Sequence, residues 1–164
     1  MHSTSKRLIK WMDEPLPGLY QQKRLLFRPD IYDMIAIYKT LNYAIFDNEL
    51  YMPRMRLAPR CRTYWGICMA SYEKDAYTKS YCTIKMMDKW FCRQWFITVL
   101  AHEMSHQYQW DILGEERNKE GKASIMSHGP SFFYHRDRMA EHGISLKISH
   151  SQRKWFEHQN FFKC

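Results

Sequence analysis

The chain has 164 residues, of which 45% are apolar and 16% aromatic, so it can bury a core but is too short for two ordinary domains. Its 25 lysines and arginines exceed its 17 acidic residues, and the formal charge of +8 favours a polyanionic partner, most often nucleic acid. No apolar run approaches the roughly 20 residues of a membrane helix, which argues against a membrane protein.

The cysteines and the N-terminus bear on the compartment. Five cysteines are present, and no two of them form a C-x-x-C pair. This pattern indicates reduced, packed thiols rather than a disulfide framework or a cysteine-ligated zinc ribbon. No apolar stretch follows the basic residues near the N-terminus, as a secretory signal requires. We therefore expect a cytoplasmic protein.

The first half of the chain predicts a basic arm, one helix and three strands. Residues 1–29 form the arm, which prolines and a glycine interrupt. A helix is predicted over about 31–46, because Asp30 can cap it and apolar residues recur at helical spacing. Strand-like segments follow near 54–58, 63–70 and 80–87, with a polar turn between the last two.

The second half predicts two further helices. A long helix is expected over about 88–110, with Asp88 as its cap, and a loop over 111–129. Gly129-Pro130 opens the next helix, since proline is tolerated at the first helical position, and Gly143 ends it. The domain is expected to span 30–146, before a basic, aromatic tail over 147–164. Helix, then strands, then helices indicates an α+β fold.

The sequence His102-Glu103-Met104-Ser105-His106 is an H-E-x-x-H motif within the predicted long helix. Residues four apart lie about 40° apart around a helix axis, so both imidazoles can reach one metal ion. Glu103 lies beside them, close enough to accept a proton from a metal-bound water. These three residues therefore predict a catalytic zinc site, with His102 and His106 as ligands and Glu103 as general base.

A catalytic zinc ion usually has three protein ligands and one open position, so a third ligand is expected. The best candidate is His128, just before the predicted helix start at Gly129-Pro130. Glu141 and Glu120 are the alternatives. The other histidines are expected away from the metal: His135 and His142 in solvent or supporting positions, and His2, His150 and His158 on the surface of the arm and tail.

Several segments together resemble the SprT-like family of zinc peptidases, which includes bacterial SprT and eukaryotic Spartan. They cover roughly residues 31–143, in family order. The matching stretches are Leu41-Asn42-x3-Phe46-Asp47-Asn48-Glu49-Leu50 through Pro53, Tyr64-Trp65-Gly66-Ile67-Cys68, Thr98-Val99-Leu100-Ala101-His102-Glu103-Met104-Ser105-His106 and His128-Gly129-Pro130-Ser131-Phe132.

This resemblance implies a zincin-like minimal metalloprotease domain, with a small antiparallel sheet packed on the H-E-x-x-H helix. It implies one Zn²⁺ ion on His102, His106 and His128, with Glu103 as the base. The zinc ribbon of bacterial SprT and the partner-binding tails of Spartan have no counterpart here. A stand-alone, monomeric bacterial or phage-type member is therefore expected. The strand around 64–70 is a candidate edge for an extended peptide substrate, and Tyr108, Tyr134 and His135 are candidates for the oxyanion stabiliser.

Two basic stretches are candidate nucleic-acid contacts. Four arginines fall at alternating positions over 54–62, so in an extended chain all four point to one side: Arg54, Arg56, Arg60 and Arg62. Lys154 and Trp155 represent the tail, where basic residues are mixed with aromatic ones. The resemblance to DNA-associated peptidases favours a DNA partner. We thus expect a zinc endopeptidase acting on DNA-associated proteins; the alternatives are a nucleic-acid-binding module with a structural zinc site, and a peptidase that acts on a specific protein without DNA.

Overall fold

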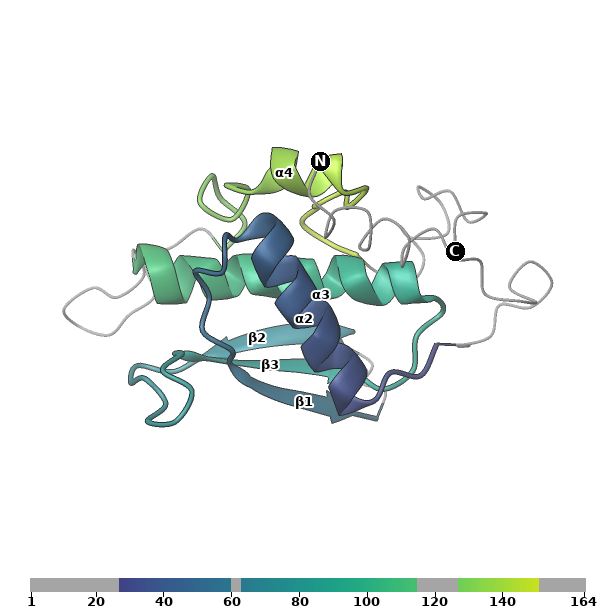
Figure 1. Ribbon diagram of the computed structural model, residues 1–164, viewed down its shortest axis with the longest axis horizontal. Coiled ribbons are helices and arrows are strands. Elements are labelled where there is room, and N and C mark those ends of the chain that lie inside the picture. The colour runs from purple at the N-terminus through teal and green to yellow at the C-terminus, as the bar shows by residue number, and fades with distance from the viewer. Residues whose placement is uncertain (1–26, 60–62, 115–126, 151–164) are drawn as a thin grey trace.

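The computed structural model describes residues 27–59, 63–114 and 127–150 (Figure 1). Most of the predicted basic arm, Arg60, Arg62, Glu120, Lys154 and Trp155 lie outside these ranges. Within them, the chain forms an α+β fold with a three-stranded sheet, as expected. No described helix is long and apolar enough to cross a membrane.

Helix α2 spans Ile31–Ile45, close to its predicted bounds. Asp30 caps it in a reciprocal capping box: the Asp30 carboxylate accepts from Asp33 N at 2.8 Å, and the Asp33 carboxylate accepts from Asp30 N at 2.9 Å. Asp47 and Asn48, with φ of 54° and 59°, turn the chain after the helix. Aspartate and asparagine tolerate this left-handed region better than most residues.

The sheet has the order β1-β3-β2, with β1 at Arg54–Ala58, β2 at Gly66–Ala70 and β3 at Cys82–Met87. Strand β2 pairs with β3 in antiparallel fashion, but β1 pairs with β3 in parallel. The expectation of an antiparallel sheet is therefore wrong, and the sheet is mixed. Consecutive strands do alternate in direction. Because β3 inserts between β1 and β2, its contact with β1 is parallel.

Helix α3 spans Arg93–Tyr108 and starts five residues later than predicted. Its cap is Cys92, whose Sγ accepts from Trp95 N at 3.4 Å, rather than Asp88. The preceding segment is extended, because Trp90 exchanges backbone hydrogen bonds of 2.8 and 3.0 Å with Phe27. Cys92 is disulfide-bonded whereas Cys68 and Cys82 are free, so the expectation of reduced thiols fails at Cys92.

After α3, the chain continues as a π-helical turn, η1, at Gln109–Leu113, which Gly114 ends with a φ of 61°. The next helix, α4, spans Arg136–Glu141, not the whole stretch predicted from Pro130. Residues 129–135 instead form consecutive turns, in which Phe132 N bonds to Gly129 O at 3.1 Å. Gly143, with a φ of 75°, ends the helical segment as expected.

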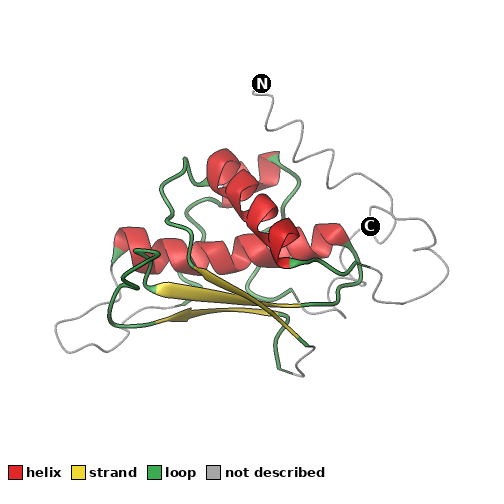
Figure 2. Cartoon of the chain, turned by 60° about the horizontal axis from the view of Figure 1, so that its bottom comes forward, coloured by secondary structure: helices red, strands yellow, loops and turns green. Residues whose placement is uncertain are grey.

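The helices lie on one side of the sheet, so the core fills the space between α3, α2 and the strands (Figures 1 and 2). Helix α3 is buried on nearly every face, because α2 and α4 flank it above the sheet. Three tryptophans close one end of this core, with ring centroids 4.5 to 5.5 Å apart: Trp65, Trp90 and Trp95. A rigid, buried α3 is a suitable support for the H-E-x-x-H motif.

Candidate metal centre

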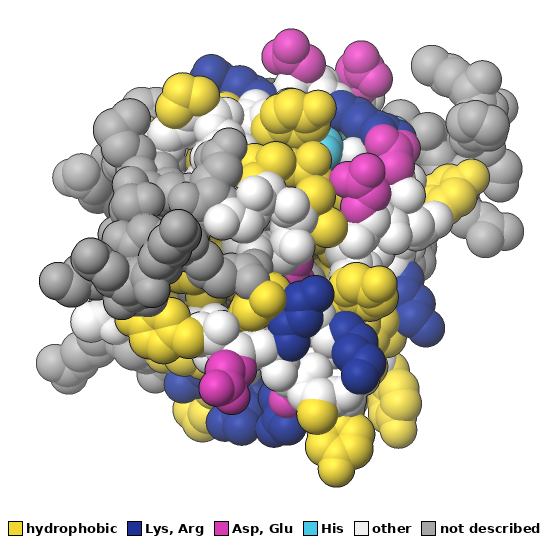
Figure 3. All heavy atoms as spheres, turned by 90° about the vertical axis from the view of Figure 1, so that its left-hand side faces the viewer, with side chains coloured by type: hydrophobic (Ala, Val, Ile, Leu, Met, Phe, Trp, Pro, Cys, Tyr) yellow, Lys and Arg dark blue, Asp and Glu magenta, His cyan; other side chains and the backbone are white. Residues whose placement is uncertain are grey.

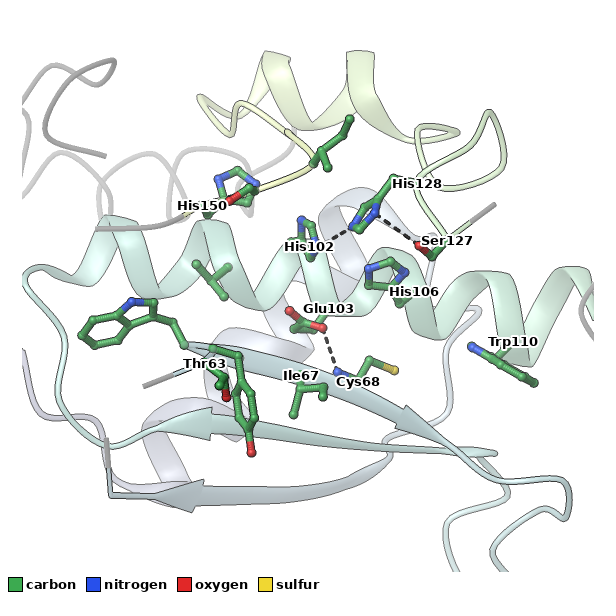
Figure 4. A pocket seen from close by; sticks show the side chains of 16 residues that line it. Thr63, Ile67, Cys68, His102, Glu103, His106, Trp110, Ser127, His128 and His150 are labelled. Atoms are coloured by element: carbon green, nitrogen blue, oxygen red, sulfur yellow. Dashed lines mark hydrogen bonds between the residues drawn. The ribbon is translucent and has the colours of Figure 1, made fainter. Parts of the chain in front are cut away.

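Three histidines from two separate segments converge beside α3. His102 and His106 lie one turn apart on α3, and His128 reaches them from the turn before α4 (Figure 4). One ring nitrogen from each lies within 4.8 Å of those of the other two. His102 Nε2 and His128 Nε2 are 3.3 Å apart. The structure thus brings together the three residues predicted as metal ligands.

Each of these imidazoles has an oxygen atom beside its Nδ1. His102 Nδ1 lies 2.9 Å from Lys147 O, His106 Nδ1 lies 3.0 Å from Gln109 Oε1, and His128 Nδ1 lies 3.3 Å from Ser127 Oγ. A carbonyl oxygen only accepts, so His102 Nδ1 carries its proton and Nε2 has a lone pair. Partners of this kind orient histidines that bind metal ions.

The three imidazoles are held in the neutral form that metal binding requires. Burial lowers the pKa of His102 to about 2 and that of His106 to about 4. Proximity to His106, His150 and His128 adds to the shift at His102. The pKa of His128 is also lowered by burial. Neutral imidazoles at physiological pH bind a cation without first losing protons.

Phe132 forms an apolar wall behind the triad. Its ring centroid lies 4.8 Å from that of His102, 4.6 Å from that of His106 and 4.8 Å from that of His128. The side chain is only 1% exposed. This contact restricts the three rings and excludes water from one side of the site.

Glu103 lies on the pocket side of α3, next to the triad. Its Oε2 accepts a 2.8 Å hydrogen bond from Cys68 N on β2, and the residue is 6% exposed (Figure 4). Burial raises the pKa of Glu103 to about 8, although the Cys68 N–H acts in the opposite direction. A neighbouring cation favours the carboxylate, so this environment suits a group that exchanges protons near neutral pH.

The triad and Glu103 line one pocket of about 640 Å³. One wall is the outer edge of β2, and the other includes Ile148, Ser149 and His150. Gly66 lets β2 approach α3 closely, since a Cβ there would lie 2.6 Å from Met86 Sδ and 3.3 Å from Glu103 Cγ. The pocket therefore gives a ligand access to the convergent histidines alongside an exposed strand edge.

The donor set fits a metal ion. Three neutral imidazoles converge, and the lone pair of His102 Nε2 faces His128 Nε2 across 3.3 Å, where a shared cation would satisfy it. Three histidines and one open position are the ligand pattern of a catalytic metal site. The residues that would hold the ion are His102, His106 and His128.

Among the described residues, neither the alternative ligand Glu141 nor the candidate oxyanion groups are brought to the site; Glu120 lies outside the described residues. Glu141 is exposed on α4 and is not part of the triad. Tyr134 is 68% exposed and stacks on Tyr108 with ring centroids 5.6 Å apart; neither residue lines the pocket, nor does His135.

Among the other described histidines, the expectation was wrong at His150. His135 and His142 lie outside the triad as expected, and at 8% and 7% exposed they are buried rather than in solvent. His150 is not simply on the surface of the tail: it lines the pocket, and its ring centroid is 5.2 Å from that of His102. Nothing in the spacing of His150 in the sequence indicated this contact.

The residues that bond to the histidine rings were also missed, although the sequence spacing of one of them, Gln109, indicated its contact. Gln109 lies three residues after His106, and residues at this spacing on a helix are neighbours. Lys147 had no such signal, since it acts through its main-chain carbonyl.

The predicted nucleic-acid contacts are only partly described. Arg54 and Arg56 are exposed on β1 and occupy alternate positions, so they share one face of the sheet. Arg54 Nε donates to Asp75 Oδ2 at 2.6 Å, which partly neutralises it. Figure 3 shows lysines and arginines in the lower half and at the top of one face, interspersed with hydrophobic and acidic side chains.

A comparison with protein-family models finds no match for this chain. A comparison with curated proteins likewise finds none. A functional assignment therefore has to be argued from the geometry of the site.

Proposed function

We propose that this protein is a zinc-dependent endopeptidase of the SprT-like type, acting on proteins associated with DNA. The observation that carries the proposal is the placement of a buried carboxylate, Glu103, in the same pocket as three convergent imidazoles. A purely structural zinc site has no need for such a carboxylate. Imidazole ligands suit zinc better than they suit Mg²⁺, Ca²⁺ or Mn²⁺, which prefer oxygen ligands.

The roles of the residues follow from their positions. His102, His106 and His128 would hold the zinc ion, which when bound supplies Lewis-acid activation of water and of the scissile carbonyl. Glu103 accepts a proton from the attacking water while the water oxygen forms a bond to the carbonyl carbon. Glu103 then delivers that proton to the leaving nitrogen as the C–N bond breaks. One water molecule is consumed for each peptide bond cleaved.

The edge of β2 supports an extended substrate. In the described sheet, β2 has a neighbour on one side only, and its free edge lines the pocket. A peptide can add to such an edge through main-chain hydrogen bonds, which gives binding without a strict side-chain preference. The N–H of Cys68 on this edge already donates to Glu103. It therefore orients the base and does not bind the substrate.

The substitution Glu103→Gln tests the catalytic role. It keeps the size of the side chain but removes the proton acceptor, so zinc content should be unchanged and cleavage of a labelled unfolded protein should fall by about 10²–10⁴-fold. Glu49→Gln, at an exposed site away from the pocket, is the matched control and should cleave like the parent. Cleavage by Glu103→Gln at the parental rate would rule out Glu103 as the base.

The cleavage assay, run with and without single-stranded DNA and combined with measurements of zinc and DNA binding, separates the competing functions. Zinc binding and DNA binding without cleavage by the parent would favour a nucleic-acid-binding module. Cleavage with no salt-dependent DNA binding would favour a peptidase directed to a specific protein, since phosphate contacts weaken steeply as salt rises.

A further inference from the structure

Gln109 lies where the two metal-binding segments meet. It follows His106 by three residues, and it is the first residue of η1, where the α-helix widens into a π-helical turn. Such turns within helices are frequent at functional sites. The side chain is 1% exposed, so both ends of its amide need partners within the protein.

The two ends of this amide contact different segments. Gln109 Oε1 is 3.0 Å from His106 Nδ1 on α3. Gln109 Nε2 donates to Ser131 Oγ at 2.9 Å. Ser131 lies three residues after His128, in the turns that carry this third histidine to the site. One side chain therefore spans the gap between His106 and the loop that bears His128.

The orientation of the amide determines which nitrogen of His106 can bind a metal ion. With Oε1 towards the ring, Nδ1 donates its proton and Nε2 has the free lone pair. With the amide reversed, its NH₂ group would require a lone pair on Nδ1, and the proton would move to Nε2. Only the observed orientation leaves Nε2 of His106 available to a cation.

His102 and His106 obtain the same tautomer by different means. The acceptor for His102 Nδ1 is the main-chain carbonyl of Lys147, which is present whatever side chain occupies that position. The acceptor for His106 is a side chain, and the same side chain also reaches the His128 loop. Ser127, beside His128 Nδ1, is a hydroxyl that can donate or accept.

We infer that Gln109 is a positioning residue of the metal centre: it holds His106 with Nε2 towards the ion and ties that ring to the loop that carries His128. The inference rests on the metal centre of the proposed function but not on its peptidase activity. It predicts that, of two substitutions at position 109, one that removes the acceptor for His106 Nδ1 lowers zinc affinity and one that keeps this acceptor does not.

The test compares Gln109→Leu with Gln109→Glu. Leucine removes both hydrogen bonds at similar volume, and zinc affinity should fall by about 10- to 100-fold. Glutamate keeps the acceptor for His106 Nδ1, and the Ser131 hydroxyl can donate to its second oxygen, so zinc affinity should equal or exceed that of the parent. Zinc affinity is measured by competition with a zinc-binding dye. The measurement is made at a temperature below the thermal unfolding midpoint of every variant.

Gln107→Leu is the matched control. Gln107 is also a fully buried glutamine on α3, but it bonds to Tyr38, Tyr51 and Asp111 rather than to a histidine. Its loss should lower the unfolding midpoint and leave zinc affinity unchanged. Co²⁺ absorption of the folded variants adds a second readout, because the tetrahedral bands should change in Gln109→Leu alone.

The outcomes are separable from those of the proposed function. Parental zinc affinity in folded Gln109→Leu, or an equal loss in Gln109→Leu and Gln109→Glu, overturns the positioning role. A parent that binds no zinc overturns the metal centre and this inference with it. A parent that binds zinc but cleaves nothing overturns only the peptidase proposal.

Discussion

The glycine at position 66 allows β2 to lie close to the face of α3 that carries Glu103. A methyl group there would lie 2.6 Å from Met86 Sδ, 3.0 Å from Val99 Cγ1 and 3.3 Å from Glu103 Cγ. The first of these distances is far below van der Waals contact, so the sulfur would have to move. Glu103, whose carboxylate accepts from Cys68 N on β2, would also have to shift by a few tenths of an ångström.

The substitution Gly66→Ala should therefore lower both stability and activity. We expect a loss of about 1–3 kcal/mol in the free energy of unfolding, typical of overpacking, measured by urea denaturation. Gly114→Ala is an instructive control, because its Cβ meets nothing within 4 Å but its φ of 61° is strained. It should cost stability without slowing cleavage. A Gly66→Ala protein as stable and active as the parent would contradict the close approach.

For single residues, the sequence predicted the three histidines that converge and missed the groups that support them. His102, Glu103 and His106 are recognisable because one helical turn separates the ligands. His128 could be selected only as the best of three candidates, since the chain path that returns it to α3 is not encoded in a short motif. Lys147 acts through its main-chain carbonyl, which no residue type reveals.

The elements differ in how fully local chemistry determines them. Helix α2 was predicted closely because Asp30 and Asp33 cap it through their own side chains. Helix α3 begins later than predicted because a tertiary contact, the pairing of Trp90 with Phe27, holds the preceding residues in an extended conformation. Helix α4 is short because a tertiary contact also holds the residues before it. The turns from Gly129 to His135 place Phe132 against the three histidines.

His135 joins three helical elements at the start of α4. Its ring centroid lies 4.6 Å from that of Phe46, at the end of α2, and 4.4 Å from that of Tyr108, at the end of α3. Burial lowers the pKa of His135 to about 4, and Arg138 adds to this shift while Asp47 opposes it. Protonation of the buried ring therefore works against the packing of α4.

This predicts a specific pH dependence of stability. Between pH 6.5 and 4, His135 is protonated in the unfolded chain but neutral in the folded protein, so acidification favours unfolding. The free energy of unfolding should fall over this interval and lose no more from this residue below pH 4. In His135→Phe, part of that slope should disappear, as measured by urea denaturation with a chelator present in both samples. Parallel pH profiles for the two proteins would contradict the assignment.

For the molecule as a whole, the sequence indicated the α+β class but not the mixed sheet. The positions of the strands in the sequence follow from local residue patterns. Their order in the sheet depends on contacts between distant segments, which place β3 between β1 and β2. The insertion of β3 also places Lys85 beside Arg56, because these two residues are register partners. Positive charges 29 positions apart in the sequence thereby lie on one face of the sheet.

This shared face leads to a prediction about DNA. If single-stranded DNA contacts the sheet, Arg56→Ala should weaken its binding and reduce the slope of log affinity against log salt by roughly 0.7 for one lost phosphate contact. Lys39→Ala removes the same charge from an exposed site on α2 and is the control. Fluorescence anisotropy over a salt series measures both slopes. Identical slopes for the two variants would place the DNA elsewhere on the molecule.

The hydrogen bond between His102 and Lys147 has a consequence for biosynthesis. The ribosome makes the histidine 45 residues before it makes the carbonyl that orients its ring. A nascent chain that has already formed the H-E-x-x-H helix therefore still lacks the acceptor that selects the metal-binding nitrogen. If the centre is the peptidase site proposed above, cleavage starts only after translation has passed Lys147, and the growing polypeptide is protected until then.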